Sequence, residues 1–223
     1  MKKAISVLVT SFFILGCSTA QPTTSANAED KKFISVMETN LKMLDTAGTA
    51  VTYIMLANTF ERIGNAEKKY WQPWYYAALC YGFIAMNTPD KTMIDPLTEK
   101  AGEYLAKATL LSNNNSEISA LQGMITNTKI LVDPITRWQT YSAEAAAFLK
   151  AAKDQNPLNP RPYLIEARTK LFTPAAMGGG AEAARPVIEK ALSNYTAFKP
   201  ENSIAPGWGL VQTQKLLARI NGK

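Results

Sequence analysis

A fixed interval of fifteen residues recurs between small or apolar positions along this chain. It separates the members of three pairs: Ile63 and Ala78, Ala108 and Gly123, and Ala152 and Ala167. In each pair the first residue is the last member of one apolar helical stripe, and the second residue lies within the next stripe. A constant phase between small helix-contact residues is typical of stacked helix pairs. The interval therefore predicts an all-α chain that is built from repeated pairs of helices.

Signals for the ends of helices support this prediction. Asp95 and Asp133 each place a carboxylate before a proline at a first helical position, and Asn115 or Ser116 can cap another helix. Strand signals are nearly absent, since there is little period-two alternation and no Asn-Gly turn. Short connections predict antiparallel neighbours. The expected helices span residues 31–45, 50–65, 72–87, 96–112, 116–129, 134–154, 160–171, 181–197 and 206–220.

The first thirty residues predict export. Lys2 and Lys3 precede an apolar stretch over residues 4–16, which is too short to span a bilayer and is typical of a signal peptide. Two cleavage sites fit: one that resembles a bacterial lipobox and ends at Cys17, which would take the lipid, and a small-residue site before Gln21. The signal peptide is thus predicted to span 1–16, or to extend to residue 20. Residues 17–30 are predicted to form a flexible linker, and residues 31–223 one helical repeat domain.

Composition excludes several kinds of site. The chain has no histidine, which excludes histidine-based triads and imidazole zinc ligands. Its two cysteines, Cys17 and Cys80, are too few for a disulfide scaffold or a four-cysteine metal site. The formal net charge is +6, but the basic residues are scattered and form no nucleic-acid patch. We therefore expect no cofactor, no metal and no nucleic-acid partner, and contact with a membrane only through an N-terminal lipid.

The apolar stripes resemble those of tetratricopeptide repeats. Trp74-x3-Ala78-x2-Tyr81 has the spacing of the first helix of such a repeat, and the stripe that begins at Ala145 resembles the second. The standard period is 34 residues, whereas successive second helices here are 45, 44 and 39 residues apart. The extra residues fall inside each pair, in three stretched loops at residues 86–97, 127–135 and 173–180. HEAT-type repeats therefore stay an alternative.

The resemblance implies a fold and a binding surface. The fold would be a right-handed α-solenoid of about four helix pairs, closed by a C-terminal capping helix. Aromatic and arginine side chains on its concave face would be typical binding anchors. The other interpretation is that the aromatic residues only fill a wide helix–helix contact. If the register carries over, the groove would be lined by Gln72, Tyr75, Leu79, Glu117, Met124, Asn127, Arg161, Leu164 and Arg168.

Three functions follow from these observations. The first is a non-catalytic exported scaffold that binds an unknown protein or peptide in the cell envelope, either in the periplasm or as an outer-membrane lipoprotein. The alternative is a small-molecule or envelope-polymer binding protein that uses the aromatic face of the helix over residues 72–87. The third is a hydrolase with a carboxylate pair, but acids such as Glu144 and Glu166 lie in no recognisable catalytic motif. We therefore expect that the protein is not an enzyme. If the groove does not decide specificity, the stretched loops are the next place to look.

Overall fold

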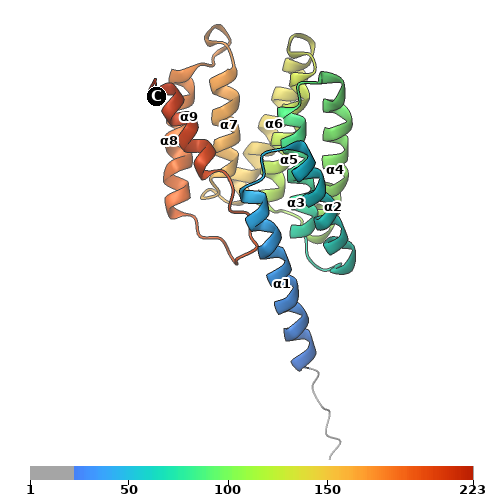
Figure 1. Ribbon diagram of the computed structural model, residues 1–223. Coiled ribbons are helices and arrows are strands. Elements are labelled where there is room, and N and C mark those ends of the chain that lie inside the picture. Colours follow the sequence, from blue (N-terminus) through green and yellow to red (C-terminus); the bar gives the residue numbers. More distant parts are fainter. Residues whose placement is uncertain (1–22, 223) are drawn as a thin grey trace, which may run out of the picture.

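The computed structural model describes residues 23–222, and in this part of the chain helices joined by loops are present, without strands (Figure 1). The predicted all-α class is therefore confirmed. The α-helices are α1 (Thr23–Asp45), α2 (Ala50–Ala66), α3 (Gln72–Asn87), α4 (Ile94–Leu111), α5 (Ser116–Thr128), α6 (Pro134–Gln155), α7 (Arg161–Phe172), α8 (Ala181–Ala197) and α9 (Leu210–Ile220). Three short 3-10 helices lie in the stretched loops: η1 (Lys91–Met93), η2 (Lys129–Leu131) and η3 (Ala175–Met177).

The predicted helix boundaries from α2 to α8 agree with the structure to within a few residues. The two terminal helices differ more. α1 begins at Thr23, so the segment predicted as a flexible linker is helical from that residue on. Asp30 helps to hold this helix, since its carboxylate accepts hydrogen bonds from Lys69 and from the Tyr70 hydroxyl, each at 2.7 Å. α9 begins at Leu210 rather than near residue 206, because the residues before it cross another face of the molecule.

Side-chain caps explain where some helices begin. Asp133 accepts hydrogen bonds from the first free amides of α6, and Asn115 accepts them at the start of α5. The predicted cap at Asp95 is wrong, since α4 begins before this residue and no side chain caps it. The Asp95 carboxylate instead accepts two hydrogen bonds from the guanidinium of Arg137, at 2.6 and 2.8 Å. An ion pair between two helices has thus replaced a local cap.

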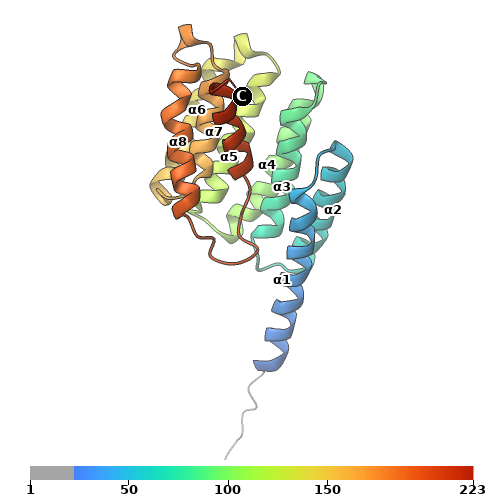
Figure 2. The same ribbon diagram turned by 60° about the vertical axis from the view of Figure 1, so that its left-hand side comes forward.

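The helices from α3 to α8 form two layers. α3, α5 and α7 contact one another in turn, and each packs against the helix that follows it, α4, α6 or α8. α2 packs on α3, and α9 packs on α8 through an apolar cluster, as expected of a C-terminal capping helix. The main core contains buried residues from each of the helices α1 to α7. The N-terminal part of α1 projects beyond the other helices (Figures 1 and 2). The contacting pairs agree with the predicted pairing, while a tetratricopeptide-like solenoid stays a prediction.

The small residues of the fifteen-residue interval lie at helix contacts. Ala78, Ala108, Ala152 and Ala167 are fully buried. A side chain at Gly123 would collide with that of Leu149 on α6. These positions are small because the two helix backbones approach closely there.

No helix within residues 23–222 is long and apolar enough to cross a bilayer. The predicted signal peptide, its two alternative cleavage sites and the lipidation candidate Cys17 lie outside the described residues. Export and lipid attachment therefore stay predictions from the sequence.

Candidate functional site

The face shared by α3, α5 and α7 is crossed by the chain's own residues 198–209, which we call the strap. In Figure 1 the strap leaves the lower end of α8 and turns upward into α9. Ile204 of the strap is buried in the main core, and its carbonyl accepts a hydrogen bond of 2.9 Å from the Tyr76 hydroxyl on α3. The predicted concave face is therefore occupied by the protein itself.

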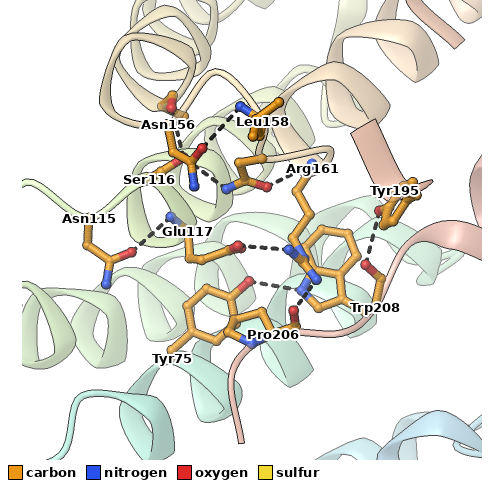
Figure 3. A network of polar contacts seen from close by, with 12 residues as sticks. Tyr75, Asn115, Ser116, Glu117, Asn156, Leu158, Arg161, Tyr195, Pro206 and Trp208 are labelled. Carbon is orange, nitrogen blue, oxygen red and sulfur yellow. Dashed lines mark hydrogen bonds and ion pairs between the residues drawn. The ribbon is translucent and has the colours of Figure 1, made fainter. Parts of the chain in front are cut away.

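Arg161 is the centre of the polar contacts beneath the strap (Figure 3). Its side chain is 1% exposed, and its guanidinium donates hydrogen bonds to Glu117 Oε1, at 2.7 Å, and to the carbonyl of Pro206. The same guanidinium lies 5.6 Å from the ring of Trp208. The indole N–H of Trp208 donates to the Tyr75 hydroxyl at 2.9 Å. This one arginine thus connects α5, α7 and the strap.

The acidic groups in this network are shielded from solvent. Burial raises the pKa of Glu117, while the guanidinium of Arg161 acts in the opposite direction. Burial also raises the pKa of Tyr75 well above its ordinary value, so its hydroxyl stays neutral. Catalysis would need these groups to reach a substrate, and Tyr75 is fully buried. The network is therefore a structural connection, because a buried charge needs a partner and Arg161 supplies it.

The predicted groove residues do not line an open groove. The strap covers the centre of the face shared by α3, α5 and α7, a contact that local sequence patterns do not contain. Asn127 is half-buried and borders a separate cavity, while Arg168 stays exposed, with its guanidinium 5.8 Å from the ring of Phe172. The other predicted groove residues are buried: Gln72, Tyr75, Leu79, Glu117, Met124, Arg161 and Leu164.

A cavity of about 330 Å³ lies between α6 and α7, on the other side of α7 from the strap. This volume is at the lower end of the range of small-molecule sites. Small residues at Ser142, Ala146 and Gly178 leave the space unfilled. The cavity is lined by Asn127, Trp138, Ser142, Ala146, Leu149, Lys150, Lys153, Glu166, Thr169, Lys170, Thr173, Met177 and Gly178.

The cavity lining is amphipathic. Its larger apolar side chains come from Trp138 and Leu149 on α6 and from Met177 in the α7–α8 loop. Three lysines also line the cavity, Lys150, Lys153 and Lys170, together with one acidic residue, Glu166. Such a lining suits a ligand that has an apolar body and anionic groups, because each part of it meets a partner of matching chemistry.

The charged side chains of the cavity are already paired. Lys153 donates a hydrogen bond to Glu166 Oε2, and the ammonium of Lys170 lies 3.8 Å from Glu166 Oε1. Lys150 pairs with Asp154 at 2.6 Å, in an exposed i,i+4 contact. Three lysines and two carboxylates, Glu166 and Asp154, leave one excess positive charge in and beside the lining. The site therefore favours an anionic ligand.

The loop that carries Met177 folds back onto the end of α7. The N–H of Gly180 donates to the carbonyl of Lys170 at 2.9 Å. Gly179 has no room for a side chain, since a Cβ there would collide with Thr173. This segment belongs to one of the stretched loops that the sequence indicated as the next place to look for specificity, and Asn127 belongs to another.

Asn127, at the border of the cavity, is held in a fixed orientation by α7. Its Nδ2 donates to Thr169 Oγ1 at 3.0 Å, and the Thr169 hydroxyl in turn donates to the carbonyl of Ile165 at 3.0 Å. Because a hydroxyl has one proton, Thr169 must accept from the amide nitrogen, and this fixes the orientation of the Asn127 amide. The oxygen Oδ1 is buried and has no partner among the described residues.

Most of the cavity residues were not predicted from the sequence. Trp138, Lys150, Lys153 and Lys170 belong to no motif, and they meet only because α6 and α7 face each other. A weak signal exists on α6, where cavity residues recur every three or four positions beside the apolar stripe that begins at Ala145. From the sequence alone, this row of cavity residues on α6 cannot be distinguished from an ordinary half-exposed helix face.

A comparison with solved structures identifies a similar protein. No protein-family model and no curated protein matches the chain. The HusA haemophore from Porphyromonas gingivalis is 37% identical in sequence and superposes with a TM-score of 0.77. The match covers 85% of this chain and 93% of the haemophore chain.

Proposed function

The chain belongs to the family of the HusA haemophore, and we propose that it is a non-catalytic protein that binds haem or a closely similar tetrapyrrole between α6 and α7. The observation that supports this proposal is the lining of the cavity, where an indole and a thioether stand beside three lysines. Haem has a flat apolar ring and two carboxylate side chains, so it matches both parts of the lining.

The absence of histidine shapes how haem would be held. With no imidazole in the chain, binding would depend on contact between the ring and the apolar side chains, and on the lysines. Trp138 would supply the largest flat contact, since aromatic rings stack favourably on other π systems. The volume of the cavity is small for such a ligand, so only part of the ring would be enclosed and the rest would stay in contact with solvent.

The cavity supports the predicted alternative, a small-molecule binding protein, better than it supports the predicted peptide scaffold. A peptide that binds across α3, α5 and α7 would have to displace the strap, including the buried Ile204. The cavity needs no such rearrangement. The non-catalytic part of both predictions is retained, and so is export, which rests on the signal-peptide pattern of residues 1–20.

A titration with iron(III) protoporphyrin IX tests the proposed function. The full mature protein should shift the Soret absorbance of the porphyrin and lose tryptophan fluorescence as Trp138 is quenched. Trp138→Ala should weaken binding about thirtyfold, equivalent to about 2 kcal/mol, because it removes the largest apolar contact.

The matched control is Ile135→Ala, which changes a 93% exposed side chain at the start of the same helix, outside the cavity lining. Its affinity should equal that of the unmodified protein. A protein that produces no Soret shift, or a Trp138→Ala variant that binds as tightly as the control, would contradict the proposal.

A further inference from the structure

Glu166 occupies the space between two cavity lysines that come from different helices. Its Oε2 accepts a hydrogen bond from Lys153 on α6, and its Oε1 lies 3.8 Å from the ammonium of Lys170 on α7. Each carboxylate oxygen thus faces one cation. The protein's own side chain shows that a carboxylate group fits between these two ammonium groups.

These charges are only partly exposed to water. The Lys153 side chain is 26% exposed and that of Glu166 is 29% exposed. Lys153 also lies 4.8 Å from the ring of Tyr163, which shields it on one side. Because water screens half-buried charges less than surface charges, a second carboxylate placed here would feel both the lysines and Glu166 strongly.

We propose that Glu166 is a specificity-determining residue, an internal counter-ion that the carboxylate of a ligand displaces from Lys153 and Lys170. This inference rests on the proposed haem-binding function. Glu166 offsets one of the two positive charges of Lys153 and Lys170. When a ligand carboxylate takes its place, the freed Glu166 repels it, so Glu166 lowers the affinity for dicarboxylate ligands and helps a carrier to release them.

The other interpretation is that the contact between Lys153 and Glu166 only joins α6 to α7. The two interpretations differ in the sign of the effect on binding. If Glu166 is purely structural, its loss loosens the cavity wall and weakens binding or leaves it unchanged. If Glu166 competes with the ligand, its loss tightens binding, and only for ligands that carry free carboxylates.

The test compares Glu166→Gln with the unmodified protein, using iron(III) protoporphyrin IX and its dimethyl ester in the same dilute detergent. Glutamine keeps the shape and removes the charge. We expect the variant to bind the free acid about five- to tenfold more tightly, as estimated for the removal of one charge at this depth. Affinity for the dimethyl ester should not change. The gain should shrink at high salt, because screening shortens the range of the interaction.

Glu144→Gln is the matched control, since it removes the same charge from an exposed position on α6 outside the cavity lining. It should change neither affinity, and the melting temperatures of both variants show that each is folded. Equal or weaker binding of the free acid by Glu166→Gln, or equal tightening for the ester, overturns the inference and leaves the proposed function intact. Absence of binding by the unmodified protein overturns both.

Discussion

Gly209 lies where the strap turns into α9, and its backbone adopts a φ of 113°. L-amino acids rarely adopt this conformation, because their Cβ meets the backbone. A Cβ at this position would also collide with the Tyr195 hydroxyl and with the side chain of Leu164. Two independent requirements, one of backbone conformation and one of space, thus demand glycine here.

Gly209→Ala should therefore lower the free energy of unfolding by about 2–4 kcal/mol, as the sum of backbone strain and overpacking. Urea denaturation followed by circular dichroism measures the change. Gly207→Ala is the control in the same strap, because a Cβ there meets nothing within 4 Å. The prediction is wrong if both variants unfold at the same urea concentration.

At the scale of the helices, Asp95 and Arg137 join the first turn of α4 to the first turn of α6. Both N–H···O contacts of the guanidinium are short, at 2.6 and 2.8 Å. The hydrogen bond from Arg137 lowers the pKa of Asp95, with a smaller opposing effect of desolvation. The Asp95 side chain is 39% exposed, so water screening keeps the contribution of this pair to stability at about 1 kcal/mol or less.

Asp95→Asn should lower the free energy of unfolding by about 1 kcal/mol or less at neutral pH. The difference in stability between the variant and the unmodified protein should vanish in acid. Because folding lowers the pKa of this carboxyl, its stabilising effect is complete above the ordinary value of 3.8 and is lost as the pH falls below it. Urea unfolding midpoints of both proteins, measured from neutral pH to below 3.8, test the direction of this pH dependence. In an Arg137→Met background, Asp95→Asn should no longer cause a pH-dependent change in stability. A destabilising effect of Asp95→Asn that grows toward low pH would contradict the assignment of the lowered Asp95 pKa to Arg137.

At the scale of the whole molecule, α7 separates two regions with different roles. Arg161 and Leu164 lie on its buried side, where Arg161 binds the strap, while Glu166 and Lys170 line the cavity. The strap brings Trp208 onto Tyr75, a residue more than a hundred positions away in the chain. The strap therefore closes one face of the molecule, and the cavity stays accessible on the other.

Trp208→Ala should lower the free energy of unfolding by about 2–4 kcal/mol, since a half-buried indole and its hydrogen bond to Tyr75 are lost. It should leave the affinity for iron(III) protoporphyrin IX unchanged, because the strap does not line the cavity. Val211→Ala, at a 58% exposed position just beyond the strap, is the control for stability. If Trp208→Ala abolishes porphyrin binding while the protein stays folded, the ligand site lies under the strap instead.

The amino-acid sequence was sufficient to predict the helical class, most of the helix boundaries and the small residues at helix contacts. These features are local: apolar spacing, an Asn115 or Asp133 cap and a buried Gly123 all act within a helix or between neighbouring helices. For the same reason the sequence indicated the stretched loops, which border the cavity at Asn127 and Met177.

Which faces of the molecule are closed and which are open depends on contacts between distant segments, and these contacts could not be predicted from the sequence. Trp208 was predicted at the start of the capping helix, yet it lies before α9 and packs against Arg161 on α7. Lys153 and Glu166 form a pair because two helices face each other, and no spacing along the chain specifies this contact. Local patterns set which residues share a helix face, but the free energy of packing distant segments decides what covers that face.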